Sequence, residues 1–254
     1  MIFSNLFASL MQLVFKPKIW IPLLGMLIIS TATTLAMSFV LQGLILDVTI
    51  YSSVLEAQPV FSVLLTQYFF EILLVLVLTF FMSVLGVISF MSTSRIAQGE
   101  SLVKAINKSM NEYQKALGIA LVFWGVFILM IFLGTILSLV ARVNEIIAIA
   151  LVGILFVVLV VVLVKTVFTL PALNKNELRN AIKSSWTFTN NKFWKSTGYL
   201  LLVGIILIIF GSIFYQIELI IQGHVIELIV LALFETFPSL FFISAITNYF
   251  YSKQ

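Results

Sequence analysis

The chain has no cysteine and very few charged residues for its length. Of its 254 residues, 9% are Asp, Glu, Lys or Arg and one is histidine. The lack of cysteine excludes disulfides, thiolate metal ligands and cysteine nucleophiles. An ordinary soluble domain carries about 25% charged residues, so this composition excludes that class of protein.

The residues that usually carry enzymatic chemistry are also scarce. The sequence contains no HExxH, no GxSxG and no glycine-rich phosphate loop. The single histidine, His224, lies near Glu218 and Glu227 in a predicted external turn. A metal site there is one interpretation, and a solvated turn is the favoured one. We therefore expect no catalytic residues, no bound metal, no cofactor and no enzymatic activity.

Long apolar stretches dominate the sequence. Hydrophobic residues make up 62% of the chain, and the mean hydropathy is +1.20. A membrane-spanning helix needs about 20 apolar residues. Six stretches qualify, over residues 19–46, 63–91, 116–140, 146–168, 197–217 and 225–251. This predicts an all-α, polytopic integral membrane helix bundle with six transmembrane helices in a single domain, residues 1–254.

The longest polar segment, residues 170–198, contains a predicted amphipathic helix. Residues at helical spacing form one face, namely Leu178, Ala181, Ile182, Ser185, Trp186 and Thr189. The spacing of Asn174 and Glu177 is typical of a capping box and predicts a helix start near them. A short basic helix between two apolar segments is typical of the membrane interface.

This segment resembles an earlier one. Residues 102–115 match residues 178–192 at Leu102, Ala105, Ile106 and Ser109. Residues 2–15 are a third amphipathic segment, followed like the others by an apolar stretch. The order predicts three parallel repeats of an interfacial helix and two spans, at about 1–95, 96–170 and 171–254.

Basic residues lie on one predicted side of the membrane. Only Arg142 of the 14 Lys and Arg residues falls on the other side. The positive-inside rule therefore predicts a multi-pass protein of the cytoplasmic membrane with both termini cytoplasmic, the N-terminal segment being retained as an anchor. Because the charges adjoin apolar segments, we expect them to bind anionic lipid headgroups and not nucleic acid. The headgroup candidates are Lys104, Lys108, Lys175, Arg179, Lys183, Lys192 and Lys195.

Several polar residues lie inside the predicted spans. Glu235 is near the middle of the sixth, with Glu227 two turns earlier, and Glu71 is near the outer end of the second. Ser30, Thr34, Ser38 and Gln42 recur once per turn in the first. One hypothesis is a polar pathway lined by these side chains. The alternative is interhelical hydrogen bonding and close packing, which small polar residues commonly provide.

A further pattern follows the fourth span: Leu170-Pro171-Ala172-Leu173, then Ser185-Trp186 and Phe193-Trp194 before the next span. It resembles a loose family of uncharacterised six-span prokaryotic membrane proteins, similar to the membrane domain of some glycerophosphodiester phosphodiesterases. The resemblance is clearest over residues 165–210 and is echoed at 95–140. It implies a membrane fold, but no phosphodiesterase catalytic domain is present and no catalytic residue is transferred.

Two functional hypotheses remain open. The leading one is a non-enzymatic polytopic membrane protein that handles a small solute or lipid through a polar intramembrane cavity. The alternative is a structural or accessory membrane protein whose cytoplasmic interfacial helices recruit a partner or sense anionic lipid. The sequence does not specify the ligand or the oligomeric state.

Overall fold

The computed structural model describes residues 2–43, 67–190, 192–221 and 227–252, and within them it contains helices and no strand. Six long helices are present: α2 (Ile21–Val40), α5 (Phe69–Ala97), α7 (Tyr113–Val143), α8 (Glu145–Thr166), α11 (Phe193–Ile221) and α12 (Glu227–Tyr251). The shorter helices are α1 (Ile2–Phe15), the 3-10 helix η1 (Pro17–Ile19), α6 (Leu102–Asn111), α9 (Thr169–Ala172) and α10 (Leu178–Asn190).

The long helices agree with the predicted spans. Five of them are long and apolar enough to cross a membrane, namely α2, α5, α7, α8 and α11, with α2 preceded by η1. α12 has the predicted position and a length of 25 residues but is not among those five. The all-α membrane bundle is confirmed.

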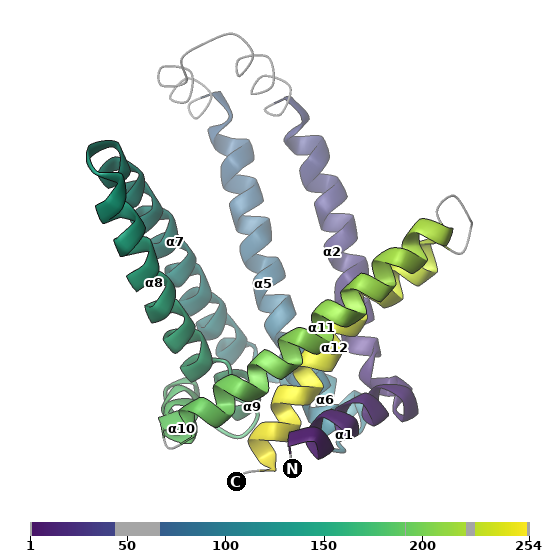
Figure 1. The fold of residues 1–254 in the computed structure, drawn as a ribbon. Helices are drawn as coiled ribbons and strands as arrows, with labels where there is room; N and C mark the ends of the chain where they lie inside the picture. Colours follow the sequence, from purple (N-terminus) through teal and green to yellow (C-terminus); the bar gives the residue numbers. More distant parts are fainter. Residues whose placement is uncertain (1, 44–66, 191, 222–226, 253–254) are drawn as a thin grey trace.

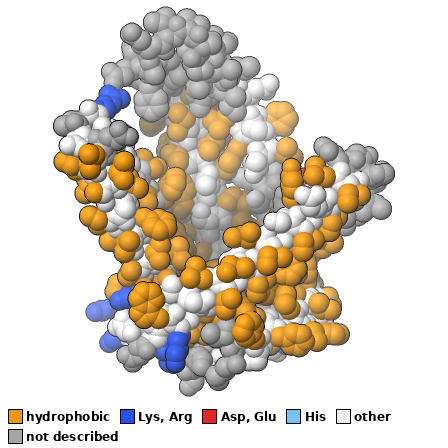
Figure 2. Space-filling model, in the orientation of Figure 1, with side chains coloured by type: hydrophobic (Ala, Val, Ile, Leu, Met, Phe, Trp, Pro, Cys, Tyr) orange, Lys and Arg blue, Asp and Glu red, His pale blue; other side chains and the backbone are white. Residues whose placement is uncertain are grey.

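The short helices form a base from which the long helices diverge (Figure 1). Large buried side chains gather in this base, among them Met91, Phe168, Leu173, Tyr249 and Phe250. By contrast, at most 17% of the most apolar stretch of any of the five candidate spans is buried within the protein. Apolar side chains therefore cover the diverging arms, where a membrane would surround them (Figure 2).

α12 is the central helix of the base and is called the pillar helix below. It contacts α1, α2, α5, α9 and α11. Tyr199 of α11 stacks on Tyr249 with ring centroids 4.1 Å apart, and the Tyr199 hydroxyl donates a hydrogen bond to the Ala245 carbonyl at 2.9 Å. Aromatic packing and this hydrogen bond, which the sequence did not indicate, thus join α11 to α12.

Of two local features predicted from the sequence, the turn between the third and fourth spans is present and the capping box at Asn174 is not. The turn between the third and fourth spans is confirmed: α7 ends at Val143 and the Asn144 side chain caps α8 by accepting a hydrogen bond from the Ile147 amide at 3.1 Å. The predicted capping box at Asn174 is wrong. α10 begins at Leu178, and the Asn174 side chain instead donates a hydrogen bond to Ser94 at 2.8 Å.

The predicted face of α10 agrees with the structure except at Trp186, which is 39% exposed. Ala181 and Ser185 are fully buried in α10, and so are the matching Ala105 and Ser109 in α6. The two helices therefore use the same small residues to approach the base. The division of the chain into three repeats stays a prediction.

α1 has apolar residues on two faces and not on one. Leu6 and Leu13 are buried against the base, whereas Phe3, Phe7 and Phe15 are 75%, 61% and 71% exposed. A helix with one apolar face in the protein and a second one exposed suits a position at the membrane interface.

The sidedness of the chain gives a direct experimental test. Both chain ends and the short helices lie at the base, while the α7–α8 turn with Arg142 lies at the far end (Figure 1). Since the chain has no native cysteine, single cysteines can replace Asn144 at the far end and Asn107 and Asn176 at the base. An impermeant thiol reagent added to whole cells should label the first and spare the other two. Ser53 and Gln222, outside the described residues, are predicted to be labelled as well. Labelling of Asn107→Cys or Asn176→Cys from outside would contradict the predicted cytoplasmic position of the base.

Candidate functional site

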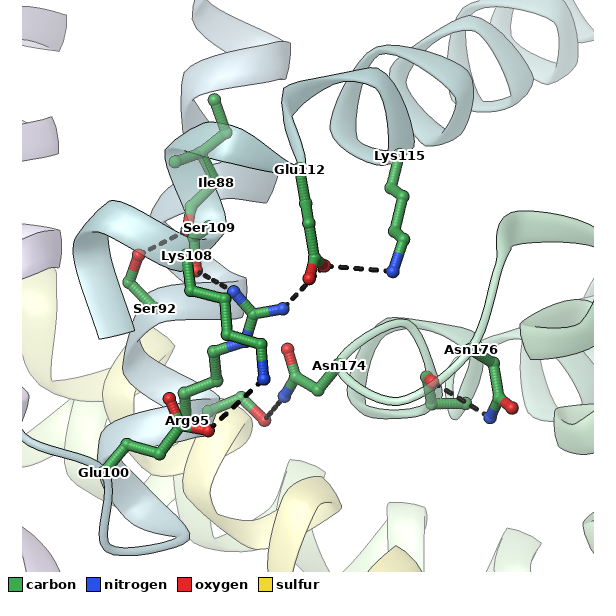
Figure 3. Close-up of polar contacts among 12 residues, drawn as sticks. Ile88, Ser92, Arg95, Glu100, Lys108, Ser109, Glu112, Lys115, Asn174 and Asn176 are labelled. Atoms are coloured by element: carbon green, nitrogen blue, oxygen red, sulfur yellow. Dashed lines mark hydrogen bonds and ion pairs between the residues drawn. The ribbon is translucent and has the colours of Figure 1, made fainter. Parts of the chain in front are cut away.

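A buried arginine organises one side of the base (Figure 3). Arg95, at the end of α5, is 1% exposed. Its guanidinium donates hydrogen bonds to the Ser109 hydroxyl at 2.9 Å and to a Glu112 carboxylate oxygen at 2.7 Å. Lys115 of α7 reaches the same oxygen at 3.0 Å. The cluster thus joins the end of α5 to α6 and to the start of α7. A buried guanidinium is unfavourable without an opposite charge, and Glu112 supplies that charge.

These neighbours change the pKa of the Glu112 carboxyl group. Partial burial raises its pKa, but hydrogen bonds from Lys115 and Arg95 and their positive charges outweigh burial. The net effect holds the pKa of Glu112 below its ordinary value of 4.5. The carboxylate is therefore ionised at neutral pH and balances the buried arginine.

Two polar networks extend the base towards α12. The Ser94 hydroxyl lies 2.8 Å from the Asn174 amide nitrogen and 3.0 Å from the Thr247 hydroxyl. In the second network, Asn248 donates hydrogen bonds to Ser9 at 2.9 Å and to Gln12 at 3.2 Å. These contacts join α1, α5 and the segment after α9 to the pillar helix.

The second network is closed by a serine of the pillar helix. Ser244 donates to Gln12 at 2.8 Å. Polar side chains in the base are thus mostly paired with one another, and this pairing holds distant segments of the chain together.

The predicted headgroup residues all belong to the base or its margin. Six of them are exposed, namely Lys104, Lys108, Lys175, Arg179, Lys183 and Lys195, whereas Lys192 is half-buried. Lys175 and Lys192 also lie over aromatic rings, 4.4 Å from the centre of Tyr251 and 5.3 Å from that of Phe188. Such contacts position the ammonium groups at the surface without neutralising them. Binding of lipid by these residues stays a prediction.

The polar stripe of the first span does not line an enclosed space within the described residues. Ser30 is half-buried, and Thr34, Ser38 and Gln42 are exposed. The Ser38 hydroxyl donates a hydrogen bond at 2.8 Å to the Leu35 carbonyl of its own helix. α2 packs on α5 with a different residue: the Thr33 hydroxyl of α2 lies 3.5 Å from the sulfur of Met82 in α5.

The three intramembrane glutamates are not brought together by described side chains. Glu71 is half-buried in the first turn of α5. Glu235 and Glu227 belong to α12 by their backbone, but their side chains lie outside what the structure describes, as does His224. The pathway hypothesis for these residues therefore stays a prediction.

The Arg95 cluster was missed by sequence analysis. Arg95 lies in α5 and Glu112 lies 17 residues later in the turn between α6 and α7, so no helical period joins them. The only signal was a charged residue at the end of an apolar span, which also suits an exposed anchor. Among the described residues, no group of three or more His, Cys, Asp and Glu side chains is placed to hold a metal ion.

Comparison with known proteins identifies part of this architecture. Residues 139–253 match the family model of the membrane domain of glycerophosphoryl diester phosphodiesterase. The match to this membrane domain begins at the end of α7 and covers α8 to α12, including the pillar helix and α10. It confirms the resemblance seen at residues 165–210. No curated protein and no solved structure matches the chain. The chain is thus a polytopic membrane protein, similar over this region to a membrane domain.

Proposed function

We propose that this protein is a non-enzymatic membrane protein that binds a membrane lipid, with the acyl chains against the diverging helices and the headgroup at the base. One observation carries the proposal: the long helices separate from a buried base and keep large apolar side chains exposed. Examples on three arms are Phe39 of α2, Phe156 of α8 and Ile208 of α11, which are 66–76% exposed. Acyl chains fit such surfaces without any polar group being desolvated.

A lipid fits these surfaces better than a polar solute does. A solute would require polar side chains around an enclosed space, whereas Thr34, Ser38 and Gln42 are exposed on α2. Basic side chains, in contrast, surround the base to which the apolar arms are attached. A phospholipid has the same order of groups, with a charged head beside an apolar tail.

The experiment is lipid retention during purification. The intact protein is extracted in a mild detergent and washed on a column with many volumes of that detergent. The lipid that remains bound is then quantified by mass spectrometry. We expect at least about one phospholipid per chain to remain, because acyl chains held between protein surfaces exchange slowly. Retention no higher than that of a single-span control protein would contradict lipid binding.

A second candidate is an accessory protein whose base recruits a partner. It is favoured by the outward faces of α6 and α10, which carry Lys104, Asn107, Lys108, Arg179 and Lys183 as exposed side chains. These faces are polar and basic, unlike the exposed phenylalanine face of α1. If the protein retained no lipid in the purification experiment, the result would favour this accessory function over lipid binding.

A further inference from the structure

A pocket at the margin of the base lies between the start of α2 and the end of α5. Its volume is about 440 Å³. One wall is the link between α1 and α2, and the other is the turn between α5 and α6. The lining residues are Phe15, Lys16, Pro17, Lys18, Ile96, Gly99, Glu100 and Ser101. Both walls adjoin ends of candidate spans, Pro17–Val40 and Phe69–Ala97, which places the pocket at the depth of lipid headgroups.

Two lysines line the first wall. Lys16 and Lys18 are both exposed. Among the ion pairs of the described residues, neither lysine has a carboxylate partner. Two lysines that are two residues apart and lack an ion-pair partner attract a phosphate at headgroup depth.

The second wall offers a hydrogen-bond acceptor. One carboxylate oxygen of Glu100 lies 3.6 Å from the ammonium of Lys108 (Figure 3). The other, Oε2, is buried and has no hydrogen-bond partner among the described residues. The Glu100 side chain as a whole is 28% exposed, so an N–H or O–H group of a ligand can approach its carboxylate, which has one oxygen without a donor.

An apolar surface adjoins the pocket. The exposed face of α1 ends at Val14 and Phe15, each 71% exposed, and continues on α2 with Ile21 at 46% and Ile28 at 70%. No charged residue interrupts α1. A molecule with its polar end in the pocket could therefore lay a hydrocarbon chain along this surface.

We propose that this pocket binds the headgroup of a glycerophospholipid, with the phosphate between Lys16 and Lys18 and an amine or hydroxyl donor on Glu100. The proposal deepens the lipid binding proposed above, on which it rests, by naming the site and the headgroup chemistry. It predicts selection for a headgroup that carries a hydrogen-bond donor in addition to its phosphate.

The test compares two lipids of equal charge. Phosphatidylethanolamine and phosphatidylcholine with the same acyl chains share the phosphate, but the choline group has no N–H. Binding of each to the full-length protein in detergent is followed by native mass spectrometry. Loss of a hydrogen bond to a buried charged group corresponds to about tenfold or more in affinity, so the ethanolamine lipid should bind about tenfold more tightly. Phosphatidylglycerol, whose hydroxyls can donate, should also exceed phosphatidylcholine.

Variants assign the effect to the pocket. Lys16→Gln/Lys18→Gln should weaken binding of all three lipids by about tenfold, whereas Lys16→Arg/Lys18→Arg should retain it. Glu100→Ala removes the acceptor and should abolish the preference for ethanolamine over choline. Arg142→Gln removes an exposed positive charge at the far end of α7, outside the base, and should change binding less than about twofold. Thermal melts of each variant confirm folding.

The outcomes separate the two proposals. If tight lipid binding persists unchanged in Lys16→Gln/Lys18→Gln, the pocket is wrong while lipid binding by the protein stands. Equal affinity of the parent for the ethanolamine and choline lipids would overturn the role of Glu100. If none of the three lipids binds, both proposals fail.

Discussion

Replacing Glu112 by Ala is expected to lower the free energy of unfolding by about 3–5 kcal/mol, because it leaves a buried guanidinium uncompensated. Arg95 is 1% exposed, and the Glu112 carboxylate is its ion-pair partner at 2.7 Å. Lys115 would then add a second, like charge to the same site. The measurement is unfolding of the purified protein in mixed micelles with increasing sodium dodecyl sulfate, followed by far-UV circular dichroism.

Three comparisons show whether the ion pair is responsible. Arg95→Met/Glu112→Ala should be less destabilised than Glu112→Ala, because no buried charge is left unpaired. Lys108→Gln, which removes the exposed partner of Glu100 at 3.6 Å, should cost at most about 1 kcal/mol. A double variant that is less stable than Glu112→Ala would show that burial of Arg95 is not the source of the cost.

The same pair has a pH dependence of known sign. Because the pKa of Glu112 is lowered in the folded protein, its contribution to stability is present above the ordinary value of 4.5 and is lost as the pH falls through the folded pKa. The parent should therefore lose more stability than Glu112→Gln on acidification below pH 4.5. Parallel pH profiles for the two proteins would contradict this assignment.

Replacing Phe168 by Ala is expected to cost roughly 3 kcal/mol, the low end of the range for deleting a buried phenylalanine. Phe168 is fully buried. Its ring centroid lies 5.1 Å from that of Phe188 and 5.7 Å from that of Tyr249. The variant would open a cavity where the end of α8 meets α10 and α12. Where lipid replaces water outside the protein, this lost packing remains the main term.

A phenylalanine on the same helix provides the control. Phe156 of α8 is 66% exposed, so Phe156→Ala should change the free energy of unfolding by no more than about 0.5 kcal/mol. Phe168→Leu, which keeps most of the buried volume, should lie between the two. If Phe156→Ala were as destabilising as Phe168→Ala, the arms would be packed against protein, and the account of them as lipid-facing would be wrong. Both variants are measured by the same unfolding experiment.

The long helices and most of the buried faces of the short helices could be predicted from the sequence. An apolar stretch of sufficient length has few alternatives to a helix in a bilayer, since every backbone polar group must be paired within it. For the same reason Ala181 and Ser185 of α10 could be predicted to face inward: helical periodicity is a local property of the chain. The unequal number of Lys and Arg residues at the two ends of the spans could likewise be counted from the sequence.

The pairing of the polar residues could not be predicted from the sequence and depends on how the helices pack. Asn174 was predicted to cap α10, but it donates to Ser94, 80 residues away along the chain. Leu6 and Phe7 are neighbours in one apolar segment, yet one is buried and the other exposed. The ion pair joins Arg95 to Glu112, and the pocket brings Lys16 and Lys18 near Glu100. In both cases the residues belong to separate segments, and no periodic pattern in the sequence indicates how those segments lie relative to one another. Such contacts depend on how separate helices pack against one another, and local propensity contains no information about that packing.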